Sequence, residues 1–213
     1  MKYKCVIFDC DGVLVDTEDI SIGTLVEMAN KLGATIDFEF AMQNFLGKSL
    51  EYCFEYIEKR CTKPFPNDFE QQYRRISFKR FKKELKAIEG VKALIEKLEV
   101  PFCVASNGPL NKMQLNLNTA GLDMLFGKNM FSAYQINKFK PDPALFIYAA
   151  KKLGFQPKEC VVIEDSEVGV KAAIDGGFDV FAFANSRSES LLRNEGARLF
   201  YHMRELYDLL AIK

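Results

Sequence analysis

The stretch KCVIFDCDGVLVD, residues 4–16, joins a short apolar run to three aspartates. Its first five residues have the near-continuous apolar character of a buried parallel strand. Asp9 and Asp11 follow at once, with only Cys10 between them. Two carboxylates this close repel each other and resist joint ionisation unless something positive lies between them. The question is which positive group in this protein lies beside the two carboxylates.

The composition is that of an ordinary protein with balanced charge. The chain has 213 residues, and 29 Lys plus Arg offset 29 Asp plus Glu. This balance indicates neither nucleic acid nor an anionic membrane as a partner. No apolar run approaches the roughly 20 residues that span a bilayer, and the N-terminal run is typical of a strand rather than a signal peptide. The six cysteines form no CxxC pair, and most lie in apolar runs, where a reduced and buried thiol is the ordinary interpretation. This favours a cytoplasmic location.

Strands and helices alternate along most of the chain. Apolar runs at residues 102–106, 130–133, 160–164 and 179–183 are separated by segments with helical spacing. Such alternation predicts parallel βαβ units whose sheet is covered on both faces. Between Thr17 and Leu85 the strand signal is absent and helical spacing replaces it. We therefore expect an α/β core from residues 1–16 and 86–213, interrupted by an all-helical insert at 17–85.

Several helix ends carry capping signals. Ser49 stands where an N-cap would begin a helix, and Asn67 and Glu70 have the spacing of a capping box. Pro109 suits the first helical position after the strand at 102–106. These signals predict where helices begin in the insert and in the core.

Polar side chains follow the predicted strands. In an open parallel sheet, ligands bind outside the carboxyl ends of the strands. The residues at those ends are Asp9 and Asp11, Ser106 and Asn107, Lys140, and Glu164 and Asp165. We expect these side chains to form one site.

Carboxylate oxygens dominate this predicted site. Asp9, Glu164 and Asp165 form a set of hard oxygen ligands, which suits Mg²⁺ with retained waters. A bound Mg²⁺ would relieve the repulsion between the carboxylates and attract a phosphate group. The sequence therefore predicts a magnesium site that serves phosphate chemistry.

The same residues can carry out phosphoryl transfer. Asp9, held against phosphorus, can act as a nucleophile and form an aspartyl-phosphate. Asp11 can protonate the leaving oxygen and later activate water. Ser106 can hydrogen-bond a phosphoryl oxygen, and Lys140 can neutralise the charge that builds up during transfer.

Each residue alone also has an ordinary structural explanation. A lone Asp-x-Asp is often a turn or a helix cap, Ser106 could simply enter a helix, and Lys140 could be a solvated surface lysine. Glu164 and Asp165 could cap the following helix. Capping alone rarely produces this order of residues at successive strand ends, so the combination favours a catalytic site. The single histidine, His202, lies near the C-terminal end, and we assign it no role.

These residues resemble the four motifs of the haloacid dehalogenase superfamily. The motifs are D-x-D-G-V-L-V-D at 9–16, Ser106-Asn107, Lys140-Pro141-Asp142-Pro143 and Glu164-Asp165-Ser166. Their order, and the helical insert after the first motif, resemble subfamily I with a C1-type cap. The resemblance implies a Rossmann-like core with a helical cap domain, bound Mg²⁺ and an aspartyl-phosphate intermediate.

The resemblance also implies a role for each matching residue. Asp9 would be the nucleophile and a metal ligand. Asp11 would be the general acid and base and would offer its backbone carbonyl to Mg²⁺. Ser106 and Lys140 would hold the phosphoryl group, and Asn107 would take part in binding the substrate. Asp165 would bind the metal, and Glu164 would help to hold the metal or its waters.

Particular residues separate the activities found in this superfamily. Dehalogenase members lack the second aspartate of the first motif, so Asp11 argues against carbon–halogen chemistry. β-Phosphoglucomutases have a histidine and an arginine at the positions that resemble Ser21 and Leu50. Phosphonatases use a lysine of the cap to form a Schiff base with the substrate. Lys48, in the turn at 46–49, stands where such a lysine could lie. A cation near the polar end of the substrate, or a solvated loop residue, is the alternative interpretation of Lys48.

Two further runs indicate a substrate. SNGPLNKMQ at 106–114 and KFKPDPALF at 138–146 are similar to those of bacterial 6-phosphogluconate phosphatases. We therefore expect a Mg²⁺-dependent phosphatase for a small phosphorylated sugar or sugar acid, with 6-phosphogluconate the first candidate. A β-phosphoglucomutase-like phosphomutase is the alternative. A phospho-receiver, which is a signalling module and not an enzyme with turnover, also has acids and a lysine at strand ends. A receiver, however, has its acid pair on strand 1 and its phosphorylated aspartate on strand 3, and it has no helical insert.

Overall fold

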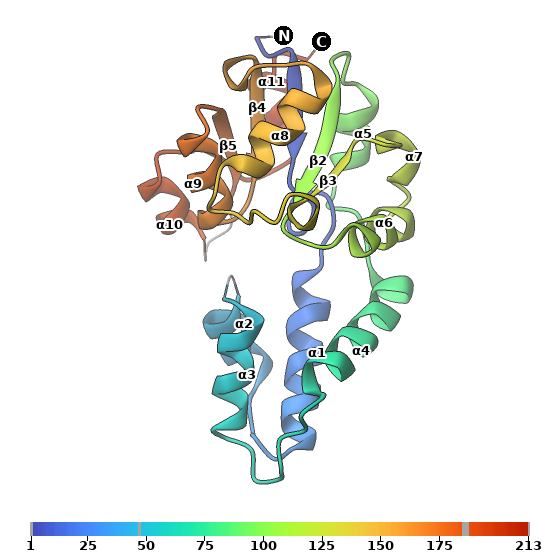
Figure 1. Cartoon of the computed structure of the whole chain (residues 1–213), viewed down its shortest axis with the longest axis vertical. Coiled ribbons are helices and arrows are strands. Elements are labelled where there is room, and N and C mark those ends of the chain that lie inside the picture. The colour runs from blue at the N-terminus through green and yellow to red at the C-terminus, as the bar shows by residue number, and fades with distance from the viewer. Residues whose placement is uncertain (1, 47, 185–187, 213) are drawn as a thin grey trace. The chain divides into compact units, whose positions relative to one another are not determined.

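The computed structural model describes residues 2–46, 48–184 and 188–212. The chain divides into two compact units, one formed by Met1–Asp16 and Lys86–Lys213 and the other by Thr17–Leu85. The first unit contains a parallel sheet with helices, and the described residues of the second form helices joined by loops (Figure 1). Within the described ranges, no helix is both long and apolar enough to cross a membrane.

Among the described residues of the first unit, six parallel strands form a sheet in the order β3-β2-β1-β4-β5-β6. Their bounds are β1 Cys5–Phe8, β2 Phe102–Ser106, β3 Met130–Ser132, β4 Cys160–Glu164, β5 Asp179–Phe183 and β6 Arg198–Phe200. The chain builds outward from β1 to β3 and then returns to place β4 on the other side of β1. This order confirms the predicted Rossmann-like α/β class, and its topological switch point lies between β1 and β4.

Helices connect the strands of this unit, and one more helix, α11, follows the last strand. They are α5 Val91–Glu96, α6 Leu110–Thr119, α7 Asp123–Phe126, α8 Ala144–Leu153, α9 Glu167–Asp175, α10 Glu189–Asn194 and α11 Glu205–Leu209, with 3₁₀ turns η1 Ala133–Gln135 and η2 Pro157–Glu159. Parallel strands require such crossovers, because the chain has to return to the same edge before each new strand.

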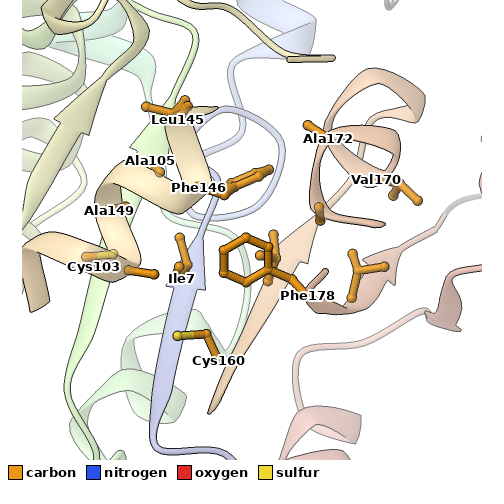
Figure 2. Packing of buried hydrophobic residues seen from close by; sticks show 14 of the residues in the cluster. Ile7, Cys103, Ala105, Leu145, Phe146, Ala149, Cys160, Val170, Ala172 and Phe178 are labelled. Atoms are coloured by element: carbon orange, nitrogen blue, oxygen red, sulfur yellow. The ribbon is translucent and has the colours of Figure 1, made fainter. Parts of the chain in front are cut away.

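Successive side chains of each strand point to opposite faces of the sheet, so every strand contributes to the packing on both faces. On one face, Ile7 of β1 packs in a cluster with side chains of β2, β4, α8 and α9. Figure 2 shows this cluster, in which Phe146 of α8 and Phe178 both lie near Ile7. The ring centroids of Phe146 and Phe178 are 6.2 Å apart. On the other face, Phe8 meets Phe126 of α7 edge-on at 6.3 Å. The burial of β1 on both faces explains its continuous apolar sequence.

The second unit has its own hydrophobic core. Its helices are α1 Glu18–Lys31, α2 Phe38–Phe45, α3 Leu50–Glu58 and α4 Phe69–Glu84. Their inward faces bury a cluster that includes Leu25, Phe45 and Ile57. Ser49 accepts a hydrogen bond from the Tyr52 N–H at 3.2 Å, which confirms the predicted N-cap of α3.

Two predicted helix starts are wrong. Asn67 and Glu70 form no capping box, because α4 begins after Asp68 and its N-cap makes no side-chain capping bond. Asp68 instead accepts a hydrogen bond from Gln72 Nε2 at 2.8 Å, one turn into the helix. Pro109 is the N-cap of α6 and not its first helical residue, with an extended ψ of 149°. In both cases the chain enters the helix one residue away from the position that the local signal favours.

We expect Ile7→Ala to lower the free energy of unfolding by about 2–5 kcal/mol, because a fully buried side chain is replaced by a cavity. Ile174→Ala on α9 is the matched control: Ile174 is 39% exposed, and its loss should change stability by less than about 0.5 kcal/mol. Urea unfolding followed by circular dichroism measures both. Equal losses for the two variants would contradict the placement of Ile7 in the core.

Candidate active site

A buried ion-pair group lies where β1 and β4 end. Lys140 Nζ is 2.5 Å from Asp9 Oδ1 and 2.6 Å from Glu164 Oε1. The three side chains are only 3%, 10% and 1% exposed, respectively. Parallel pairing places Phe8 opposite Ile163, so the residues that follow them, Asp9 and Glu164, come side by side. The first cation that these carboxylates meet is therefore a lysine from a distant loop.

Charge and burial act in opposite directions on these groups. Burial lowers the pKa of Lys140, but the charges of Asp9 and Glu164 outweigh it and leave that pKa raised. Burial raises the pKa of Asp9 to about 7, with Glu164 and Asp11 adding to the effect and Lys140 opposing it. Lys140 therefore stays an ammonium group, and Asp9 lies in a surrounding that still favours more positive charge.

Protein donors engage both oxygens of Glu164. Its Oε1 meets Lys140, and its Oε2 accepts bonds from the backbone N–H groups of Asp165 and Ser166 at 2.8 Å and from Ser166 Oγ at 2.9 Å. Gly169 on α9 leaves room for this carboxylate, since a Cβ there would collide with it. Glu164 therefore holds Lys140 and the β4–α9 turn, and its assignment to the metal stays a prediction.

Asn107 holds the backbone of Lys140. Its Oδ1 accepts from the Lys140 N–H at 2.8 Å, and its Nδ2 donates to the Lys140 carbonyl at 3.3 Å. The peptide bond from Lys140 to Pro141 is cis, and the ammonium group lies 4.6 Å from the centre of the Phe146 ring. Both polar ends of the Asn107 side chain thus serve to fix Lys140, a task that the sequence-based assignment to the substrate did not include.

Asp11 has partners different from those of Asp9. Lys112 Nζ lies 2.6 Å from its Oδ2, and Asn116 Nδ2 donates to its Oδ1 at 3.1 Å. The Asp11 side chain is 30% exposed, so it is more accessible than Asp9. The two acids, two residues apart in sequence, therefore lie in separate electrostatic surroundings.

A tight loop brings Asp165 beside the first acidic pair. Gly12 has a φ of +82°, a conformation that favours glycine. A Cβ at Gly12 would collide with the Asp165 carboxylate, so this carboxylate lies directly against the loop after Asp11. Asp165 thus joins Asp9 and Asp11 at the same edge of the sheet.

Ser106 ends β2 and lies at the neighbouring strand end. It is 4% exposed, and its Oγ accepts a bond from the Gly108 N–H at 3.0 Å. A hydroxyl group that accepts one bond still has its own proton to donate. Ser106 can therefore donate a hydrogen bond to an anion at this strand end.

The remaining predicted residues lie in the helical unit. Lys48 is exposed and precedes the N-cap Ser49 of α3, while Ser21 and Leu50 are partly buried on α1 and α3. Gly47, the other member of the predicted turn, lies outside the described residues. The structure thus places Lys48 on a different unit from the carboxylates and Lys140.

The donor chemistry of the site suits a hard divalent cation. Four carboxylates and two ammonium groups gather here, so this group of side chains has an excess of negative charge. Within residues 2–46, 48–184 and 188–212, no three acids, histidines or cysteines are already arranged to hold a metal. Carboxylate oxygens of the kind that Mg²⁺ prefers are present in Asp9, Asp11 and Asp165, and both oxygens of Glu164 already accept bonds from protein donors.

Three residues of this site were not predicted from the sequence: Lys112, Asn116 and Gly169. Lys112 and Asn116 follow the strand-end residues by only a few positions and share one face of a helix, which is the signal that could have revealed them. Gly169 gave no signal, because a glycine in a helix is recognisable as necessary only when its neighbour is known.

The chain is similar in sequence to a known family and to individual proteins of known activity. Residues 6–183 match the family model of haloacid dehalogenase-like hydrolases. The chain is 34% identical over 209 residues to 6-phosphogluconate phosphatase of Escherichia coli (strain K12), covering 98% of this chain and 95% of the relative. It is 26% identical over 181 residues to a phosphorylated carbohydrates phosphatase of Thermotoga maritima, covering 83% and 82%.

A solved structure shows the same architecture with an anion bound. It is a HAD family hydrolase from Deinococcus radiodurans, with bound phosphate and sodium. It matches with a TM-score of 0.85 and 29% identity, covering 99% of this chain and 96% of the other.

We expect Gly169→Ala to destabilise the protein by about 1–3 kcal/mol, because the added Cβ collides with the buried Glu164 carboxylate. Gly23→Ala on α1 is the matched control. A Cβ there would lie 3.7 Å from its nearest neighbour, an ordinary contact, so alanine should stabilise the helix by up to about 1 kcal/mol. Thermal and urea unfolding measure both. A Gly169→Ala variant as stable as the unaltered protein would contradict the position of Glu164.

Proposed function

The chain belongs to the haloacid dehalogenase-like hydrolases and is an enzyme of their phosphoric monoester hydrolase type, and on that premise we propose that it removes phosphate from a small phosphorylated sugar or sugar acid. 6-Phosphogluconate is the first candidate, supported by the 34% identity to the E. coli enzyme. The observation that carries the proposal is the Asp9–Lys140–Glu164 group buried at the switch point of the sheet. A carboxylate beside a fixed ammonium group is suited to attack a phosphate ester.

In the first half of the proposed reaction, Asp9 is the nucleophile. One of its carboxylate oxygens forms a bond to phosphorus while the bond from phosphorus to the sugar oxygen breaks. Asp11 gives its proton to that leaving oxygen, so the sugar departs as an alcohol. The products of this half are the free sugar and an aspartyl-phosphate on Asp9.

In the second half, water removes the phosphoryl group. Asp11, now a carboxylate, takes a proton from the water, whose oxygen bonds to phosphorus as the bond to Asp9 breaks. Inorganic phosphate leaves, and Asp9 and Asp11 return to their starting states. The greater exposure of Asp11 supports this role, because a proton carrier has to reach both water and the leaving group.

Lys140 and Ser106 stabilise the transferred group in this proposal. The raised pKa of Lys140 keeps its positive charge in place beside Asp9. The hydroxyl group of Ser106, at the neighbouring strand end, donates a hydrogen bond to a phosphoryl oxygen. Asn107 supports the transfer by fixing the Lys140 backbone.

We further propose that Asp9 and Asp165, together with the backbone carbonyl of Asp11, hold Mg²⁺. When bound, the cation shields the phosphate charge from the carboxylates and so permits their approach. Glu164 contributes by fixing Lys140 and the turn that carries Asp165.

The helical unit, residues 17–85, is proposed to be a C1-type cap that selects the substrate. Lys48, exposed before α3, would supply a cation for the carboxylate or hydroxyl groups of the substrate. All six cysteines are free, five of them buried, which supports a reducing compartment and thus the cytoplasm.

The test of this function is phosphate release from a panel of esters. With Mg²⁺, we expect the protein to release phosphate from 6-phosphogluconate and to lose that activity in excess chelator. Lys48→Ala should lower mainly kcat/KM for the sugar acid, and Lys63→Ala on the same unit is the control. Incubation with β-glucose 1-phosphate and its bisphosphate tests the mutase alternative. Isomerised sugar without free phosphate would favour that alternative, and no release from any panel member would refute the phosphatase.

Asp9→Asn should abolish turnover, because the amide keeps the shape of the side chain but cannot attack phosphorus. Asp11→Asn should lower the rate by about 10²- to 10⁴-fold through loss of proton transfer. Free phosphate and acid-precipitated phosphoprotein measure the two halves of the reaction. Near-normal turnover in a folded Asp9→Asn protein would rule out the covalent route.

A further inference from the structure

Asp11 has two partners that the proposed reaction does not yet explain. Lys112 and Asn116 lie four residues apart on α6, so their side chains leave the same face of the helix. Lys112 bonds to one oxygen of the Asp11 carboxylate and Asn116 to the other, at 2.6 and 3.1 Å. Each oxygen of this carboxylate thus has its own donor from one rigid helix.

The burial of Asn116 indicates a purpose other than stability. Asn116 is fully buried on the face of α6 that also buries Met113 and Leu117. Its Oδ1 has no hydrogen-bond partner among the described residues. A buried polar atom without a partner lowers stability, which an apolar side chain of similar size would avoid. Packing alone would therefore favour leucine here, and the amide is explained by its bond to Asp11.

The Lys112–Asp11 pair is partly enclosed by the turn between β2 and α6. The two side chains are 22% and 30% exposed. A Cβ added at Gly108 would lie 3.7 Å from Lys112 Cδ and 3.9 Å from Asp11 Oδ2, so this turn runs close to both. An ion pair in open solvent restricts its members little, whereas here the backbone limits where the carboxylate can go.

We propose that Lys112 and Asn116 are positioning residues that hold the carboxyl group of Asp11 for proton transfer. The proposal rests on the function proposed above, in which Asp11 is the acid and base. Two donors from one helix restrict the rotation of the carboxyl group. An acid already near the leaving oxygen reacts faster than one that has to find it. α6 follows Ser106 directly, so the same segment fixes both the phosphoryl group and the proton donor.

Two aryl phosphates separate this role from a general loss of binding or folding. p-Nitrophenolate is a weak base that leaves without a proton, whereas phenolate is a stronger base that gains more from an acid. We expect Lys112→Met and Asn116→Leu to lower kcat/KM for phenyl phosphate about tenfold or more. The loss for p-nitrophenyl phosphate should be much smaller, and inhibition by inorganic phosphate should be unchanged. Lys112→Arg, which keeps the cation, should restore most of the activity.

Matched variants control for the chemical change itself. Lys171→Met on α9 removes an exposed lysine paired with Asp175 at 3.3 Å, and Asn118→Leu replaces an exposed asparagine of α6. Neither should change the ratio of the two esters. Asn116→Leu should keep or raise the melting temperature while lowering activity, a combination that a merely structural residue would not give.

A double variant decides whether Lys112 acts through Asp11. In an Asp11→Asn protein, Lys112→Met should add little further loss. A full additional loss, or equal losses for the two esters, would overturn the proposal. Failure of the proposed function gives a different result: Asp11→Asn would itself leave the ratio of the esters unchanged, or the unaltered protein would hydrolyse neither. Either of these results would overturn the inference together with its premise.

Discussion

The ammonium group of Lys140, buried between two carboxylates, is the interaction on which the rest of the site depends. Adjacent parallel strands bring Asp9 and Glu164 to the same buried place, where two carboxylates without a cation repel each other. The lysine places a positive charge between the two carboxylates, and removal of one partner would leave a buried charge uncompensated. The backbone clamp from Asn107 and the space left by Gly169 are both understandable as means of keeping this group together.

The topology of the sheet explains why these residues meet. The carboxyl ends of all six parallel strands lie along one edge, and the chain reverses its direction of growth between β1 and β4. In open parallel sheets, ligands generally bind at such a point, outside the carboxyl ends of the strands. Side chains from segments more than 100 residues apart, such as Lys112 and Asp11, can therefore bond there. A fold of this kind collects polar groups without interrupting the apolar core beneath them.

Two acids separated by one residue have distinct surroundings in this arrangement. Asp9 is nearly buried and faces Lys140, whereas Asp11 is more accessible and faces Lys112 and Asn116 on α6. Different surroundings allow two carboxyl groups of the same type to take different roles. The separation originates in the loop after β1, where the left-handed Gly12 turns the chain away from the strand direction.

The sequence by itself determined the α/β class, the strands at 102–106 and 160–164, and the cap of α3 by Ser49, because apolar periodicity and side-chain capping act over a few residues. It also indicated which polar residues follow which strands. Only the tertiary structure decided the start of α4, the addition of β6 at the edge of the sheet, and the partners of Glu164 and Asp11. Those features depend on contacts between distant segments, and local sequence contains no record of which donor reaches a given oxygen.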